Sequence, residues 1–475
     1  MKRFWLILSA CALAGWAGAI FAAPATPPTD TANTNVVNTN IVHTPAQAAA
    51  ETARMQWFEN AKFGVFIHWG IYAVDGITES WSFHDGWVSW HHYMQQLAGF
   101  TASHYDPQAW ADLIKDSGAK YAVLTAKHHD GVALWPTTHG LNVVNDTPAH
   151  RDLVGPFVRA LRKDGLKVGL YFSLIDWSSR LYPGFVSPIG NPGYAKPVQR
   201  YRIKDDPKRW NRFVTYYQDQ VHDLTRRYHP DLYWFDGDWE HTAAEWHAKP
   251  LRGWILAHNP NAIINGRLAG YGDYATPEQG VPITRPPDKY WELCMTMNDS
   301  WGYQPNDHNF KTPYEIIRIL SDTLDMGGNL LLDIGPRADG TLPKIEVDTL
   351  KQVGRWIKKN HEAVYGTRAG IPHDYYLGDS TLSQNHETLY LFLDGQPNGP
   401  ILLKGLTNHV VRARVVGNGT MLFPKRIGTT LGGAPAILAI PVPKYAFDPD
   451  ITVIAVHLDG PIKLFQNQGK PISDY

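Results

Sequence analysis

The sequence is poor in cysteine, with only Cys11 and Cys294 among 475 residues. Cys11 lies in a segment that we expect to be removed, so the mature chain keeps one cysteine and can form no internal disulfide. Stability must therefore come from a hydrophobic core. Apolar residues make up 44% of the chain, which allows a large core spread over two or three domains.

The chain also lacks an excess of charge of either sign. It has 44 basic and 45 acidic side chains, a net charge of −1, and no basic block. Nucleic acids are bound through concentrated positive charge, so this composition argues against such a partner. Aromatic residues are abundant instead, with 18 tryptophans and 23 tyrosines. Most must pack in the core, but their flat faces also suit the apolar faces of sugar rings.

Long apolar runs are absent except near the N-terminus. There, two basic residues precede an apolar run over residues 4–20, and small residues follow. This pattern predicts a secretory signal peptide over residues 1–23 and export, to a bacterial periplasm. Residues 8–11 (LSAC) also resemble a bacterial lipobox, so a lipoprotein anchored at Cys11 is the alternative. The short apolar stretch before Cys11 favours ordinary cleavage. No other run is long enough to predict a membrane span.

The next part of the chain divides into a linker and an α/β domain. Residues 24–48 are rich in Pro, Thr, Asn and Ala without apolar periodicity, which predicts a disordered linker. Strand-like and helical patterns then alternate, and we assign residues 49–368 to one domain. Its predicted strands cover residues 64–69, 121–126, 168–173, 232–236, 262–265, 290–295 and 329–334. Seven buried strands separated by helices predict a TIM-like (β/α) barrel in which one strand is irregular or missing.

Three helices of this domain have clear start signals. Asp106, Asp206 and Thr312 are each followed by proline, which suits the first position of a helix. Glu315 completes a capping box with Thr312. These signals predict helices that begin at residues 107, 207 and 313.

The pattern changes after residue 368. Short strands separated by Gly, Pro and Asn replace the alternation, and no convincing helix occurs between residues 372 and 470. The predicted strands cover residues 388–393, 401–403, 410–416, 437–440 and 451–458. We therefore expect residues 369–475 to form an antiparallel β-sandwich domain, and we expect it to brace the barrel rather than to bind glycan.

Residues 231–240 (DLYWFDGDWE) contain the strongest candidate for a functional group. Asp236 ends a buried strand, immediately before Gly237. A carboxylate is costly to bury without a purpose, and active sites form at the carboxyl ends of barrel strands. Side chains alternate along a strand, so Trp234 shares a face with Asp236. Asp236 is therefore either a catalytic carboxylate above a floor made by Trp234 or a cap for the following helix.

Polar side chains gather at the same ends of the other predicted strands. These groups are His68 after the first strand, His128 and His129 after the second, Tyr171 in the third, Arg267 and Glu278 after the fifth and Glu292 in the sixth. The opposite ends of the strands show no such gathering of polar groups. If these polar residues only capped helices or turns, they would be scattered over both ends of the strands. We therefore expect them to form a shared site at this face of the barrel.

Hydrogen-bonding groups and tryptophan faces together suit a small polyhydroxylated ring, and two carboxylates suit glycoside hydrolysis. A metal hydrolase is a second possibility, with His68, His128, His129 and Asp236 as ligands. However, adjacent His128 and His129 cannot both point inward while the strand continues, and no HxH or HExxH spacing occurs, so we expect no metal. A sugar-binding module without catalytic activity is a third possibility. Two carboxylates about 5 Å apart would distinguish a retaining enzyme from such a module.

Six motifs in this order resemble the α-L-fucosidases of glycoside hydrolase family 29. They are residues 61–70 (AKFGVFIHWG), 121–131 (YAVLTAKHHDG), 234–237 (WFDG), 274–278 (YATPE), 298–303 (NDSWGY) and 327–336 (GGNLLLDIGP). The resemblance covers about residues 52–365. The resemblance implies a (β/α) barrel followed by a β-sandwich, which matches the division made above.

The resemblance also implies roles for individual residues. Asp236 would be the nucleophile and Glu278 the general acid/base of a retaining, exo-acting α-L-fucosidase that needs no metal or organic cofactor. Fucose hydroxyls would be held by His68, His128, His129, Tyr171 and Arg267. Trp234 and Trp301 would line the ring and its methyl group. Some members also use a Glu-Trp pair, whose nearest match here is Glu79 and Trp81, with one residue between them.

A second carboxylate, Asp238, follows closely after Asp236. The face shared with Trp234 favours Asp236 as the nucleophile. The implied substrate is a fucosylated oligosaccharide or glycoconjugate. The linkage, the aglycone and the oligomeric state do not follow from the sequence.

Overall fold

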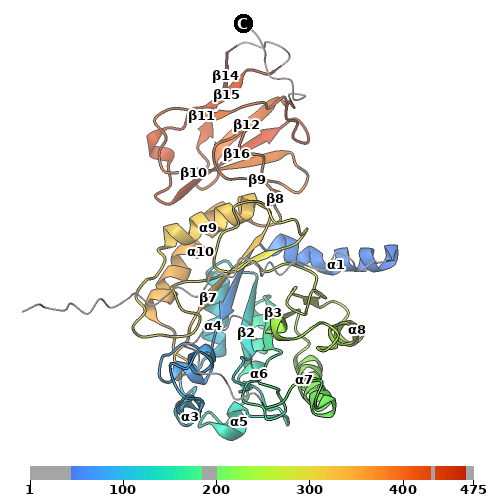
Figure 1. Cartoon of the computed structure of the whole chain (residues 1–475). Coiled ribbons are helices and arrows are strands. Elements are labelled where there is room, and N and C mark those ends of the chain that lie inside the picture. Colours follow the sequence, from blue (N-terminus) through green and yellow to red (C-terminus); the bar gives the residue numbers. More distant parts are fainter. Residues whose placement is uncertain (1–43, 185–199, 429–433, 467–475) are drawn as a thin grey trace, which may run out of the picture. The chain divides into compact units, whose positions relative to one another are not determined.

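The computed structural model describes residues 44–184, 200–428 and 434–466 (Figure 1). The predicted signal peptide and most of the predicted linker lie outside the described residues. Helix α1 (Pro45–Ala61) begins within the last residues of that linker, so this end of the linker prediction was wrong. Thr44 and Gln47 form a capping box, and Pro45 opens an alanine-rich first turn. These local signals favour a helix even without an apolar stripe.

Seven parallel strands form one curled sheet, as predicted for a TIM-like barrel (Figure 1). They are β1 (Phe63–Ile67), β2 (Tyr121–Lys127), β3 (Lys167–Ser173), β4 (Leu232–Asp236), β5 (Ile263–Ile264), β6 (Glu292–Thr296) and β7 (Asn329–Ile334). Their order is β5-β4-β3-β2-β1-β7-β6. Nearly every strand residue is buried, which explains why the strands are continuous apolar runs rather than alternating ones.

The gap between the two edge strands, β5 and β6, is bridged by an irregular segment, residues 273–278. Isolated parallel bridges join Asn265 to Tyr274 on the β5 side, and they join Ala275 to Trp291 and Glu278 to Cys294 on the β6 side. This segment takes the place of the irregular strand expected from the sequence. It also carries the predicted acid/base, Glu278.

Helices follow the strands as in other (β/α) barrels. The longer ones are α4 (Pro107–Asp116), α6 (Val154–Lys163), α7 (Pro207–Tyr228), α8 (Ala248–His258), α9 (Pro313–Asp325) and α10 (Lys344–Val364). Short helical segments are α2 (Trp81–His84), α3 (Trp90–Gln95), α5 (Val143–Asp146), η1 (Ile71–Ala73), η2 (Gln96–Gly99) and η3 (Asp238–Glu240). The three predicted helix starts are confirmed, because Asp106, Asp206 and Thr312 each accept a backbone N–H at the N-cap.

None of the helices among the described residues is long and apolar enough to cross a membrane. The apolar run over residues 4–20 lies outside the described residues, so the signal peptide, the export and the lipoprotein alternative stay predictions.

The C-terminal part is built from two antiparallel sheets, as expected for a β-sandwich (Figure 1). Its strands are β8 (Arg368–Ala369), β9 (Ser380–Leu382), β10 (Thr388–Asp394), β11 (Ile401–Leu403), β12 (Val410–Val415), β13 (Met421–Leu422), β14 (Lys425–Ile427), β15 (Ile437–Ile440) and β16 (Ile451–Leu458), with one short helical turn, η4 (Lys444–Ala446). The five predicted strands are present. The short strands β8, β9, β13 and β14 were not predicted.

Strands β10 and β16 contribute to two cores at once. Leu389, Leu391, Ile454 and Val456 belong to the core of the sandwich, whereas Tyr390, Phe392 and Val453 belong to the barrel core. In addition, the indole Nε1 of Trp356 in α10 donates to the backbone oxygen of Ile451, at 2.8 Å. These contacts are of the kind expected if the sandwich braces the barrel.

Candidate active site

Asp236 is the last residue of β4, and its side chain is 11% exposed. Gly237 follows with a φ of 82°, a left-handed conformation that glycine adopts without strain. This turn separates Asp236 from Asp238, whose Oδ2 accepts the backbone N–H of Ala269 at 2.8 Å. Burial raises the pKa of Asp238 to about 6. Asp238 therefore fixes the loop that contains Ala269.

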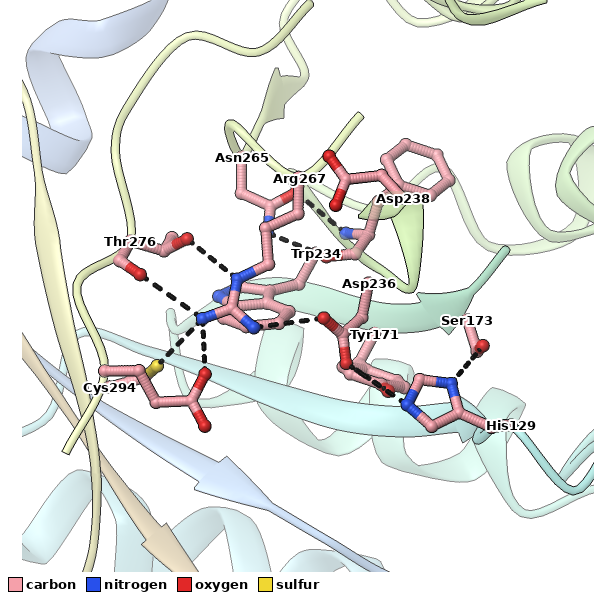
Figure 2. Close-up of polar contacts among 12 residues, drawn as sticks. His129, Tyr171, Ser173, Trp234, Asp236, Asp238, Asn265, Arg267, Thr276 and Cys294 are labelled. Carbon is pink, nitrogen blue, oxygen red and sulfur yellow. Dashed lines mark hydrogen bonds and ion pairs between the residues drawn. The ribbon is translucent and has the colours of Figure 1, made fainter. Parts of the chain in front are cut away.

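Three side chains from neighbouring strand ends surround the Asp236 carboxylate (Figure 2). The Tyr171 hydroxyl donates to Oδ2 at 2.8 Å, and a guanidinium nitrogen of Arg267 donates to Oδ1 at 3.0 Å. The Nε2 atom of His129 lies 3.6 Å from Oδ2. Both oxygens are therefore held, which fixes the direction of the carboxylate.

Arg267 connects Asp236 to the second predicted catalytic carboxylate, Glu278. One terminal nitrogen binds Asp236, and the other lies 2.6 Å from Oε2 of Glu278. The backbone oxygen and the hydroxyl of Thr276 accept from the remaining positions, at 3.2 and 3.0 Å. Although burial lowers the pKa of Arg267, Glu278 and Asp236 raise it well above its usual value. The positive charge of Arg267 thus lies between the buried carboxylate of Asp236 and that of Glu278, whose side chain is 38% exposed.

The three predicted histidines all reach this site, and each is anchored through Nδ1. The Nδ1 atom of His68 lies 2.6 Å from Asp333, that of His128 lies 2.7 Å from Ser80, and that of His129 lies 2.5 Å from Ser173. Burial lowers the pKa of each imidazole well below its usual value. The site therefore contains three neutral rings whose Nδ1 atoms are already bound.

The expectation that His128 and His129 cannot both point inward was wrong. Strand β2 ends at Lys127, so the alternation of side chains does not apply to the two residues that follow. Both rings reach the site: that of His128 stacks on Tyr171 at 5.5 Å, and that of His129 faces Asp236.

Aromatic rings form the apolar part of the site. Trp234 stacks on Tyr171 with ring centroids 5.6 Å apart, and the guanidinium of Arg267 lies 4.6 Å from its centroid. The indole Nε1 of Trp234 donates to buried Glu292 at 3.0 Å, which fixes the plane of the ring. Trp301 lies 4.9 Å from the His68 ring.

Glu79 and Trp81 also belong to this region, despite the residue between them. Glu79 is buried, and burial together with the charges of Glu278 and Asp236 raises its pKa to about 7. Its Oε2 has no hydrogen-bond partner among the described residues. The Trp81 ring packs edge-on against His129 at 5.7 Å. All eleven predicted site residues are thus brought together at one end of the barrel.

The family model described as Alpha-L-fucosidase matches residues 31–362. The chain belongs to the α-L-fucosidase family. It is therefore a glycoside hydrolase, and the resemblance drawn from the six motifs is confirmed.

Curated relatives include the tissue α-L-fucosidases of rat and human. The rat protein is 34% identical over 347 residues, which cover 66% of this chain and 70% of the relative. The human protein is 33% identical over 339 residues, which cover 66% of this chain and 69% of the relative.

Solved α-L-fucosidases have the same fold. Isoenzyme 1 from Paenibacillus thiaminolyticus has a TM-score of 0.77 and 33% identity, covering 86% of this chain and all of that one. A family 29 enzyme from Bacteroides thetaiotaomicron, described as a trapped covalent intermediate with 2-fluoro-fucosyl fluoride, has a TM-score of 0.74 and 27% identity, covering 86% of this chain and 96% of that one.

Sequence reasoning missed the residues that orient the predicted site of this fucosidase. They are Ser80, Ser173, Thr276 and Asp333, each bonded to a histidine or to Arg267. Two of them were detectable. Ser173 is the last residue of β3 and pairs in register with Asp236, and Asp333 lies at the same end of β7. The strand-end argument applied to Asp236 would have selected both.

Two features outside this site also contain polar groups. A cavity of about 520 Å³ is lined by Arg318 and by residues around β10 and β11. The ligand atoms of Asp325, His373 and Asp379 lie within 4.8 Å of one another. However, Asp379 is already ion-paired with Arg318, and neither feature contains a predicted site residue. We therefore expect the chemistry of the family at the carboxyl ends of the barrel strands.

Proposed function

We propose that this fucosidase releases terminal α-L-fucose from oligosaccharides or glycoconjugates with retention of configuration, by a double displacement. The observation that carries the proposal is the pairing of Asp236 and Glu278 with the same Arg267 guanidinium. Two carboxylates on the two terminal nitrogens of one guanidinium lie close enough to act on one glycosidic bond. Their different exposure suits different tasks, because the nucleophile meets only the sugar whereas the acid/base must also meet water.

In the first step Asp236 attacks the anomeric carbon. A bond forms between a carboxylate oxygen and that carbon as the glycosidic bond breaks, and Glu278 gives its proton to the leaving oxygen. In the second step Glu278 takes a proton from water, the water oxygen attacks the anomeric carbon, and the ester with Asp236 breaks. Arg267 keeps Asp236 oriented for attack through its hydrogen bond to Oδ1.

The surrounding groups support an exo-acting enzyme for a deoxy sugar. Three neutral imidazoles can bind hydroxyl groups, and the faces of Trp234 and Trp301 can contact an apolar methyl group. A fucose ring has three free hydroxyl groups and one methyl group when it stands at the end of a glycan. The imidazoles and the tryptophan faces therefore match the hydroxyl and methyl groups of one fucose residue at the end of a glycan.

Hydrolysis of 4-nitrophenyl α-L-fucoside, followed by ¹H NMR from the first turnover, tests the proposal. The sugar should appear first as α-L-fucose and reach the β anomer only by mutarotation. Initial release of β-L-fucose would indicate a single displacement, and binding without turnover would indicate a sugar-binding module.

Metal removal should have no effect on this activity. The proposed steps use two carboxylates and an arginine, and the Nδ1 atoms of the three histidines are already bound to protein groups. We expect kcat/KM on the nitrophenyl fucoside to be unchanged after exhaustive dialysis against EDTA. Loss of activity that zinc or manganese restores would favour the metal-hydrolase alternative instead.

A further inference from the structure

We infer that Ser173 is a positioning residue that makes the Nε2 atom of His129 an obligatory hydrogen-bond acceptor for a hydroxyl group of the substrate. The inference rests on the proposed function and adds to it which group donates and which accepts in the hydrogen bond between the substrate and His129. Figure 2 shows the Ser173 hydroxyl beside Nδ1 of His129.

A serine hydroxyl has one proton to donate. The Oγ atom of Ser173 lies 2.8 Å from the backbone oxygen of Ile175, and a carbonyl oxygen can only accept. The single proton of Ser173 is therefore used in that bond. The Oγ atom also lies 2.5 Å from Nδ1 of His129, and in this second contact it must accept. The proton of the neutral His129 ring consequently lies on Nδ1.

This tautomer leaves a lone pair on Nε2 of His129. The side chain is 1% exposed, and among the described residues Nε2 has no hydrogen-bond partner. It faces Oδ2 of Asp236 across 3.6 Å, so two acceptors point at each other. Protonation of Nε2 would relieve this conflict, but burial, supported by the positive charges of Lys127 and Arg267, lowers the pKa of His129 well below its usual value. Since Oδ2 already accepts from Tyr171, a neutral donor from the substrate is needed only for Nε2.

The position of this donor follows from the reaction. Asp236 bonds to the anomeric carbon through one oxygen, so a group close to its carboxylate lies on or next to that carbon. The hydroxyl on the neighbouring carbon, the 2-hydroxyl, is the donor that can reach Nε2 of His129 beside Asp236. Tyr171 already donates to Oδ2 from its own side. We therefore assign the 2-hydroxyl of fucose as the donor to Nε2 of His129.

Inhibition by L-fucose and by 2-deoxy-L-fucose measures this contact without the chemical step. In the wild type the deoxy sugar should bind about 3- to 10-fold more weakly, as expected for one hydrogen bond between neutral groups. In Ser173→Ala the ring is free to carry its proton on Nε2, and the 2-deoxy penalty should fall below about 2-fold. An unchanged penalty in Ser173→Ala would overturn the inference.

Two serine variants serve as matched controls. Ser80→Ala removes the hydroxyl bound to Nδ1 of His128, and it should leave the 2-deoxy penalty in place. Ser321→Ala removes a buried hydroxyl that donates to the backbone of α9, away from the site, and it should change neither inhibition constant. Equal loss of the penalty in all three variants would show a merely structural effect and contradict a specific role for Ser173.

A second measurement needs no change at Ser173. In protein labelled with ¹⁵N-histidine, the imidazole signals lost in His129→Asn should be those of a neutral ring protonated on Nδ1. Signals of an Nε2-protonated ring would overturn the inference. A wild type that cleaves no fucoside and binds no fucose would instead contradict the proposed function, so the two failures are distinguishable.

Discussion

Replacement of Asp236 by glycine should lower kcat/KM on 4-nitrophenyl α-L-fucoside on the order of 10⁴-fold or more, because no ester can form without the carboxylate. The space left by the side chain lies beside Arg267 and Tyr171, which normally bind two carboxylate oxygens. A small anion should enter this space. Added azide is therefore expected to restore turnover by attacking the anomeric carbon directly, and the product should be β-L-fucosyl azide.

The neighbouring carboxylate supplies the control for this experiment. Asp238 accepts a backbone N–H from Ala269, and an asparagine oxygen can accept the same bond. Asp238→Asn should therefore keep activity within about tenfold of the wild type and show no rescue by azide. An inactive Asp238→Asn that azide rescues, or a nearly fully active Asp236→Gly, would show that the nucleophile had been assigned to the wrong residue.

The barrel strands were predictable because burial on both faces makes each one a continuous apolar run. The predicted and observed bounds of β4 and β7 agree, and those of β1, β2, β3, β5 and β6 differ by at most two residues at either end. Residues 273–278 could not be recognised in this way. They join the barrel through isolated bridges rather than through a regular ladder, so they have neither the length nor the apolar pattern of a strand. The short strands β8, β9, β13 and β14 were missed for the same reason.

The candidate site was predictable to the extent that strand ends reveal it. Asp236, His68 and Tyr171 stand out because polar groups at buried strand ends are unusual. The partners that orient them are less visible, since the contact between His129 and Ser173 joins residues 44 positions apart. Such pairs depend on the register of neighbouring strands, which pattern and composition do not specify.

Arg267 shows how a sequence pattern can identify a residue and still miss its place in the site. The resemblance implied that Arg267 binds a fucose hydroxyl. In the structure its guanidinium is bound to Asp236, Glu278 and Thr276. This arrangement links the proposed nucleophile to the proposed acid/base before substrate arrives.

Replacement of Glu278 by alanine should affect substrates according to their leaving groups. A nitrophenolate needs little protonation, so the ester with Asp236 should still form rapidly and then accumulate, giving a burst followed by slow turnover. A fucosylated disaccharide has a poor leaving group, and its kcat/KM should fall by about 10²- to 10⁴-fold. Azide needs no general base, so it should restore turnover on the nitrophenyl fucoside and yield α-L-fucosyl azide, the opposite anomer from that of Asp236→Gly.

Glu79 is the control that makes this assignment decisive. Its pKa of about 7 would also suit a general acid, and it lies close enough to be influenced by Asp236 and Glu278. However, Glu79 is buried and has no contact with Arg267 among the described residues, whereas Glu278 is open to the water that the second step requires. Glu79→Gln should therefore lower kcat/KM by a similar factor for both substrates and show no azide rescue. If leaving-group dependence and rescue followed Glu79 instead, Glu278 would not be the acid/base.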